Sequence, residues 1–316
     1  MRSAETLRVA LAQIAPVWLD RGKTVAKVAE YIRDAAAESA DLVAFGEGLV
    51  PGYPFWIERT DGARFNSPAQ KQVFAHYLDQ AVVIERGDID ALRRACRKSS
   101  IAAYVGLIER APDRGGHSVY CSLAFIDGKG DVRSVHRKTQ PTYEERLVWA
   151  AGDGHGLQVH ALGHFRVGAL NCFENWMPLM RSALYAQGED LHVASWPGGI
   201  HNTRDITRFL AIENRSYVAS VSGLLRLEDI PENTPCRTQL AREGSWFANG
   251  GSAVAGPDGE WLVEPVVDKE VLVLADLEHV SVREERHNFD LAGHYSRPDV
   301  TRLTVNRDRQ ATAVFS

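Results

Sequence analysis

The alternation of strand-like and helix-like segments constrains the fold of this chain more than any other feature. Residues 7–14 follow the pattern of a strand, and residues 21–38 then place apolar side chains on one helical stripe. Residues 42–45 form a short apolar run that ends just before Glu47. A strand, a helix and a second strand in this order form a layer in which the helix packs on the sheet. The start of the chain therefore predicts an α/β fold.

The same alternation continues along the rest of the chain. It predicts helices at residues 69–80, 89–99, 176–187 and 203–215, and strands at residues 101–109, 120–126, 165–170, 191–195 and 217–225. The sequences Asp127-Gly128 and Asp258-Gly259 indicate hairpin turns, because glycine accepts the positive φ that tight turns need. No repeat or linker divides the chain, so we expect a single domain over residues 1–316. After about residue 277 the sequence becomes polar, and we expect irregular structure.

Charge and hydropathy exclude two classes of partner. The formal net charge of -5 at pH 7 provides no broad basic surface of the kind that nucleic acid or an anionic membrane requires. The longest apolar stretch, residues 42–57, contains Glu47, glycines and prolines, so it is not a uniform membrane helix. Arg2 and Glu5 precede a strand-like run rather than the apolar core of a signal peptide. We therefore expect a cytosolic protein with a small-molecule partner.

Cys172 is the cysteine with the most suggestive position. The four cysteines are scattered and form no CxxC pair, which indicates neither a disulfide framework nor a thiolate zinc site. Cys172 follows strand 165–170 and precedes helix 176–187, at the sheet edge where open α/β folds place ligands. The N–H groups of that helix would favour a thiolate and stabilise negative charge during acyl transfer. The alternative is a small core side chain, which is the common role of a free cysteine. We interpret Cys96, Cys121 and Cys236 as structural or incidental.

Glu47 and Lys138 are candidate partners of this sulfur. Glu47 directly follows a buried strand between two glycines, where burial would raise the pKa of a carboxyl group unless it were paired. The alternative is a surface glutamate at the start of a loop. Lys138 ends a basic triplet, which is usually solvated. Residues 141–149 that follow are too apolar and too irregular in charge for a plain surface loop, so a buried lysine is plausible here; it would lower a thiol pKa and hold developing negative charge.

The eleven histidines raise two alternatives, a cysteine–histidine dyad and a metal site. His155, His160 and His164 fit no compact zinc spacing, and no protease-like signature surrounds a cysteine. We interpret most of the histidines as surface or hydrogen-bonded core residues.

Three long motifs, spread over most of the chain, together resemble the nitrilase branch of the carbon–nitrogen hydrolase family. The motifs are Phe45-Gly46-Glu47 with Pro51-Gly52-Tyr53-Pro54, His136-Arg137-Lys138 through Trp149 with Gly152-Asp153-Gly154, and Asn171-Cys172-Phe173-Glu174-Asn175-Trp176-Met177-Pro178-Leu179. Two further segments are more similar to true nitrilases than to amidase branches: Trp196-Pro197-Gly198 and His294-Tyr295-Ser296-Arg297-Pro298-Asp299.

The resemblance implies an α-β-β-α sandwich and a catalytic triad of Glu47 as general base, Lys138 as charge stabiliser and Cys172 as nucleophile. It implies Glu145 as a second carboxylate near the sulfur, and neither a cofactor nor a metal. The expected reaction is hydrolysis of a nitrile to a carboxylic acid and ammonia through a covalent thioimidate and thioester. The resemblance also implies a homodimer or a larger homo-oligomer.

Substrate range follows less directly from the motifs. Nitrilases usually carry tryptophan where this chain has Phe173, and other residues where it has Gly46 and Gly48. We expect an aromatic substrate pocket, because pockets are mostly apolar with few polar groups, although core packing is the alternative for each side chain. The candidate residues are Tyr53, Trp56, Phe173 and Trp196. Two alternative functions stay open: hydrolysis of amides or N-carbamoyl compounds by the same triad, and a catalytically silent binding or assembly module.

Overall fold

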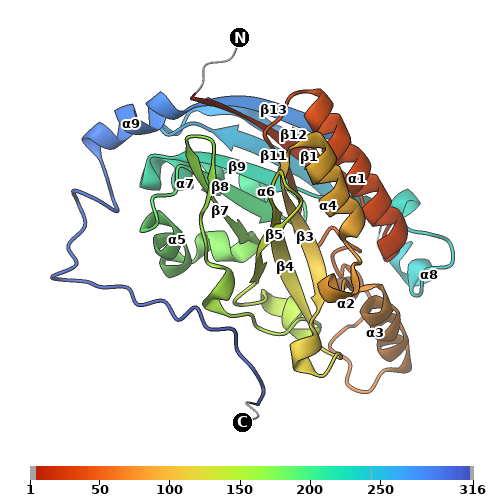
Figure 1. Ribbon diagram of the computed structural model, residues 1–316. Helices are drawn as coiled ribbons and strands as arrows, with labels where there is room; N and C mark the ends of the chain where they lie inside the picture. The colour runs from red at the N-terminus through yellow and green to blue at the C-terminus, as the bar shows by residue number, and fades with distance from the viewer. Residues whose placement is uncertain (1–4, 243, 314–316) are drawn as a thin grey trace.

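Two β-sheets that pack face to face form the centre of the molecule (Figure 1). The computed structural model describes residues 5–242 and 244–313. The first sheet has the strand order β13-β1-β2-β3-β4-β5. Its strands are β1 (Thr6–Gln13), β2 (Leu42–Phe45), β3 (Ala102–Arg110), β4 (Val119–Ile126), β5 (Val132–Arg137) and β13 (Val271–Glu278).

The second sheet has seven strands, in the order β10-β11-β9-β8-β7-β6 with β12 paired to β11. Its strands are β6 (His160–Leu162), β7 (Phe165–Asn171), β8 (Leu191–Trp196), β9 (Tyr217–Ser222), β10 (Leu224–Arg226), β11 (Trp246–Ala255) and β12 (Trp261–Val267). Strands β1, β2 and β3 are parallel in the first sheet, and β7, β8 and β9 are parallel in the second. Each sheet therefore has a parallel centre, and functional residues follow strands of both.

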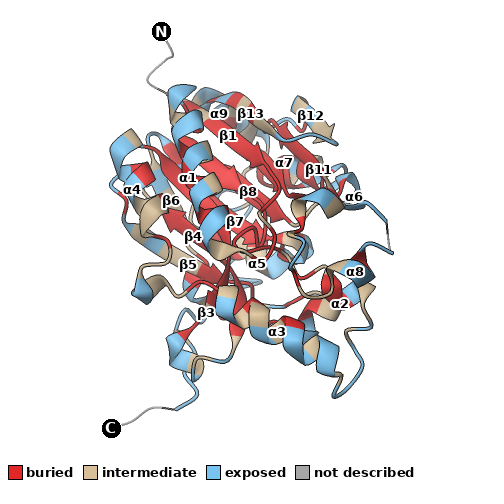
Figure 2. Ribbon diagram, turned by 90° about the vertical axis from the view of Figure 1, so that its right-hand side faces the viewer, coloured by how far each residue is buried: buried red, intermediate tan, exposed pale blue. Residues whose placement is uncertain are grey.

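Helices cover the outer faces of both sheets. These are α1 (Arg21–Ala37), α4 (Asp90–Ser99), α5 (Pro178–Tyr185) and α7 (Ile206–Asn214), and the other longer helices are α3 (Pro68–Gln80) and α9 (His279–Asn288). Apolar residues of α1 and α4 pack on the first sheet, and residues of α5 and α7 pack on the second. A third cluster, which includes Leu11, Phe125 and Val193, fills the space between the sheets. This arrangement confirms the α-β-β-α sandwich, and Figure 2 shows the buried strands between helices with exposed outer faces.

Short helical turns connect these elements. They are α2 (Trp56–Arg59), α6 (Ile200–Thr203), α8 (Arg237–Leu240) and the 3-10 turns η1 (Ile84–Arg86), η2 (Pro112–Arg114), η3 (Tyr143–Leu147), η4 (Gly154–Gly156), η5 (Cys172–Trp176) and η6 (Leu227–Asp229). No helix in the described part of the chain is both long and apolar enough to cross a membrane.

Three of the predicted elements differ from the structure. The helix predicted at residues 176–187 is split, because the turn η5 follows the strand and α5 begins only at Pro178. The strand predicted at residues 217–225 breaks at Gly223, where a Cβ would lie 2.5 Å from the carbonyl oxygen of Pro197. The region expected to be irregular from about residue 277 begins with the end of β13 and the polar surface helix α9, which buries only Val282. Residues 289–313 contain no helix or strand.

Candidate active site

Glu47 lies where the chain leaves β2 and meets the second sheet. Its backbone N–H donates to the carbonyl oxygen of Trp196, at the end of β8, over 3.1 Å. Gly46 permits this approach, because a Cβ there would lie 2.9 Å from the same oxygen. The Glu47 side chain is fully buried, and desolvation raises its pKa to about 7 in spite of the neighbouring Lys138. The carboxyl group is therefore able to accept or donate a proton near neutral pH.

Lys138 follows β5 directly and joins two buried carboxylates. Its Nζ donates to Oε1 of Glu47 over 2.8 Å and to Oε2 of Glu145 over 2.7 Å. Burial alone would lower the Lys138 pKa, but the negative charges of the Glu47 and Glu145 carboxylates hold that pKa well above its ordinary value. The ammonium group therefore stays charged next to the sulfur, as the sequence analysis expected of a buried lysine.

Glu145 belongs to the 3-10 turn η3 and is held by three donors. Besides Lys138, the backbone N–H of Thr142 donates to Oε2 over 2.6 Å, and the hydroxyl of Tyr53 donates to Oε1 over 2.8 Å. Burial, together with the nearby carboxylates, raises the Tyr53 pKa well above its ordinary value, so Tyr53 remains a phenol. The structure thus brings Tyr53, Lys138 and Glu145 together in one hydrogen-bonded group.

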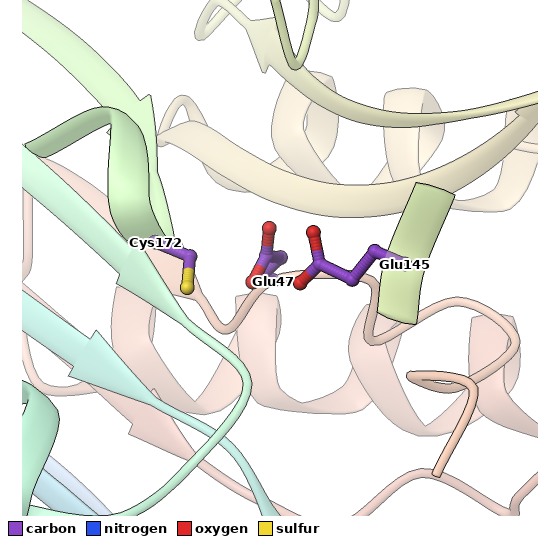
Figure 3. A group of neighbouring side chains, drawn as sticks. All are labelled: Glu47, Glu145 and Cys172. Carbon is purple, nitrogen blue, oxygen red and sulfur yellow. The ribbon is translucent and has the colours of Figure 1, made fainter. Parts of the chain in front are cut away.

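Cys172 completes this group from the second sheet. Its sulfur and one carboxylate oxygen from each of Glu47 and Glu145 lie within 4.8 Å of one another. Figure 3 shows the Glu47 carboxylate between the sulfur and the Glu145 carboxylate in that view. The Cys172 backbone has a φ of 44°, in the left-handed region that side chains other than glycine seldom adopt. The backbone N–H of Phe173, the next residue in this turn, acts to lower the pKa of the Cys172 thiol.

The protonation state of Cys172 differs from the expectation. Donors at the turn were expected to favour a thiolate, but burial raises the pKa of the Cys172 thiol well above its ordinary value and outweighs the opposite effect of Lys138. The resting sulfur is therefore a thiol, and it needs a base in order to react. Glu47 Oε2 is buried and accepts no hydrogen bond from the described residues, so it is available for the proton.

A metal ion does not fit this cluster well. Glu47, Glu145 and Cys172 have ligand atoms close enough to one another to hold one. However, the Lys138 ammonium already donates to both carboxylates, and a divalent cation between them would be repelled by this charge at close range. The buried lysine supplies the positive charge that a metal would otherwise bring.

Comparison with known proteins identifies the family. The model of the carbon-nitrogen hydrolase family matches residues 8–287, which is most of the chain. The chain belongs to this family. Among curated proteins, "Nitrilase 2" from an unknown prokaryotic organism is 34% identical over 306 residues, which cover 96% of this chain and 94% of that protein. An "Aliphatic nitrilase" from Rhodococcus rhodochrous is 34% identical over 328 residues, which cover 98% and 85% respectively.

A solved structure shares the fold of this carbon–nitrogen hydrolase. The carbon-nitrogen hydrolase from Helicobacter pylori G27 superimposes with a TM-score of 0.70 at 18% identity, covering 93% of this chain and 96% of that one. This likeness agrees with the sandwich architecture described above.

A buried acid that the sequence analysis did not single out connects the two halves of the hydrolase site. Glu174 accepts hydrogen bonds from the backbone N–H and the hydroxyl of Thr139, both over 2.7 Å, and from Nε2 of His136. It also accepts from the backbone N–H of Asn171 over 3.2 Å. Glu174 therefore ties the segment that carries Lys138 to the turn that carries Cys172. The signal was present in the sequence, because Glu174 lies within the motif around Cys172.

The four residues predicted to form an aromatic pocket occupy different environments in the hydrolase. Tyr53 contacts Glu145, as described, and Trp196 belongs to a buried cluster against which Cys172 packs. Phe173, next to Cys172 in the sequence, is about half exposed. Trp56 is fully buried against Tyr77, with ring centroids 4.6 Å apart, and against Trp18. Core packing, the alternative interpretation, therefore accounts for the position of Trp56.

Proposed function

We propose that this enzyme hydrolyses organic nitriles to carboxylic acids and ammonia, with Cys172 as the nucleophile. The observation that carries the proposal is the buried, hydrogen-bonded group of Glu47, Lys138 and Glu145 with the Cys172 sulfur within 4.8 Å of both carboxylates. The relatives described above are named as nitrilases, which supports nitriles as the substrate class.

The first half of the reaction forms a covalent intermediate. Glu47 takes the thiol proton of Cys172 as the sulfur bonds to the nitrile carbon, and one C–N π bond becomes a lone pair on nitrogen. The Lys138 ammonium and the backbone N–H of Phe173 are placed to stabilise this negative charge. The nitrogen takes up the proton from Glu47, which gives a neutral thioimidate and restores the carboxylate.

The second half releases both products. One water adds to the thioimidate carbon as Glu47 takes its proton and passes it to the nitrogen. Glu47 then transfers the proton of the new hydroxyl group to the nitrogen, the C=O bond forms, and the C–N bond breaks to release ammonia. A thioester remains on Cys172. A second water attacks the thioester with Glu47 again as base, the C–S bond breaks, and the sulfur recovers its proton. The net reaction consumes two waters per nitrile and releases one carboxylic acid and one ammonia.

Replacing the sulfur tests the covalent mechanism. We expect Cys172→Ala to release no ammonia from a panel of nitriles, whereas Cys96→Ala, a matched change at a buried cysteine in α4, should stay active. The wild-type enzyme, quenched during turnover, should gain the mass of one substrate-derived adduct. Tryptic digestion should place this adduct on the peptide that contains Cys172. Ammonia release by Cys172→Ala at the wild-type rate would refute the proposal. Turnover of amides but not nitriles would reassign the substrate class.

We also infer that the enzyme works as a homo-oligomer in the cytosol. Apolar side chains are exposed at the start of α5 and along α7, among them Leu179, Phe209 and Ile212, and such patches commonly mark interfaces between subunits. Four free thiols suit a reducing compartment. Light scattering coupled to gel filtration should give a mass of at least twice 35.0 kDa. A monomer at micromolar concentration would contradict the inference about assembly.

A further inference from the structure

A buried series of hydrogen-bonded polar side chains ends at the carbonyl group of Cys172. Asn175 Nδ2 donates to the carbonyl oxygen of Cys172 over 2.8 Å. Asn175 Oδ1 contacts Nε2 of His192 over 2.8 Å, and Nδ1 of His192 contacts Oε1 of Glu189 over 2.9 Å. Asn175, Glu189 and His192 are at most 1% exposed. Gly168 makes room for the acid, because a Cβ there would lie 2.1 Å from Glu189 Oε1.

The hydrogen bonds determine where the protons lie between Asn175, His192 and Glu189. Asn175 uses its amide N–H groups on backbone carbonyls, so its Oδ1 is an acceptor and His192 Nε2 must be the donor. His192 Nδ1 faces a carboxyl oxygen, so a proton must lie between those two atoms as well. The pair is therefore an imidazolium with a carboxylate, or a neutral imidazole with a carboxylic acid. In both states the His192–Glu189 pair is neutral overall, which suits its full burial.

The contact at Cys172 falls on a strained peptide. A left-handed residue other than glycine is strained and persists only where its surroundings enforce it. The sulfur reaches Glu47 and the Phe173 N–H from this conformation. We propose that Glu189, His192 and Asn175 are positioning residues, which hold the Cys172 carbonyl and thereby keep the sulfur aimed at Glu47. The proposal rests on the proposed role of Cys172 as nucleophile.

The orientation of the Asn175 amide is the critical link. With His192 as donor to Oδ1, the amide N–H must face the Cys172 carbonyl, whereas the flipped amide would place two oxygens against each other. Arg181 adds support, because its Nη1 donates to the Asn175 carbonyl oxygen over 2.9 Å. None of these groups touches the nitrile in the proposed mechanism. Their effect should therefore appear in the rate of bond formation at sulfur and only weakly in substrate binding.

Two kinds of variant test this inference. Asn175→Asp keeps the shape but replaces the donor with an acceptor, and His192→Ala removes the group that orients Asn175. We expect each to lower kcat by about 10- to 100-fold, the size of effect that small misplacements produce, with KM changed by less than about threefold. Alkylation of Cys172 by iodoacetamide, followed by peptide mass, should slow in parallel. His192→Gln, which keeps an N–H donor at the Nε2 position, should recover most of the rate.

Controls separate positioning from loss of fold. His160→Gln, at a histidine in β6 outside this chain of contacts, should keep kcat and the alkylation rate. Wild-type kcat in folded Asn175→Asp, or a rate in His192→Gln as low as in His192→Ala, would overturn the inference. If His192→Ala does not fold, Asn175→Asp decides by its kcat, and His192→Gln is compared with the wild type instead, where a kcat lower by more than about tenfold would overturn the inference. Ammonia release by Cys172→Ala would instead refute the proposed function, so the two failures are distinguishable.

Discussion

Glu174→Gln should weaken the fold by an amount that the contacts of Glu174 define. The carboxylate is fully buried and accepts from the Thr139 N–H and hydroxyl, the His136 Nε2 and the Asn171 N–H. A glutamine has one acceptor oxygen, which can keep the two bonds to Thr139. Its NH₂ group can donate to His136 if that imidazole moves its proton to Nδ1, an atom with no partner among the described residues.

One additional donor then loses its acceptor, since His136 Nδ1 lacks a partner among the described residues both before and after the exchange. The Asn171 N–H would face the new NH₂ group, and an unsatisfied buried N–H costs about 1–3 kcal/mol. We therefore expect the free energy of unfolding at pH 7 to fall by about that amount. Urea titrations of wild type and Glu174→Gln, followed by tryptophan fluorescence, measure the difference. Glu264→Gln, the same exchange at an exposed position in β12, should be close to neutral.

Acid should reduce this difference. Although burial acts to raise it, the Glu174 pKa is lowered in the folded protein by His136 and Thr139. A carboxyl group with a lowered pKa stabilises the fold above its unfolded pKa, about 4.3, and loses that contribution as the pH falls through its folded pKa. Glutamine does not titrate, so the two proteins should converge below about pH 4.3. Equal stability at pH 7, or a difference that stays constant on acidification, would refute this reasoning.

Two further predictions concern the catalytic carboxylates. The Glu47 pKa is raised to about 7, and the base must be ionised to react. On a nitrile that does not titrate, kcat/KM should therefore fall on acidification below pH 7, approaching about tenfold per pH unit. A profile that is flat down to pH 5 would contradict the role of Glu47. Glu145→Gln should lower kcat by at least about tenfold with a smaller change in KM, since Glu145 holds Lys138 and Tyr53 near the sulfur; steady-state kinetics with unchanged kcat would count against it.

Periodic patterns predicted most elements of the fold. The apolar run at residues 42–45 coincides with β2, and the stripe at residues 21–38 differs from α1 by one residue at its end. The break at Gly223 was missed because it depends on the close approach of Pro197, a contact between distant segments that leaves no periodic signal. The late start of the helix after Cys172 has a local cause, because the turn η5 ends at Trp176 and Pro178 opens α5, but apolar periodicity does not register it.

In the candidate site, too, the sequence predicted some residues, and the folded structure was needed for the others. Motifs around Glu47, Lys138 and Cys172 were sufficient to nominate these residues, and the structure places Glu145 with them. Trp56 looked equivalent to Trp196 in sequence, because both are tryptophans near a motif, but only Trp196 shares a cluster with Cys172. The supporting acids Glu174 and Glu189 went unnoticed. Glu174 contacts His136 and Thr139, which are remote in the chain, and the Glu189 side chain contacts His192 only three residues away, but neither pairing follows a periodic pattern.

Glu47 and Lys138 follow strands of one sheet, whereas Cys172 follows a strand of the other. The reacting atoms therefore become neighbours only while the two sheets are docked. Any partly unfolded state in which the sheets separate would be inactive, even with every strand intact. Turnover is consequently a direct reporter of sheet docking, and under gradual denaturation activity should disappear no later than the signal of the inter-sheet core.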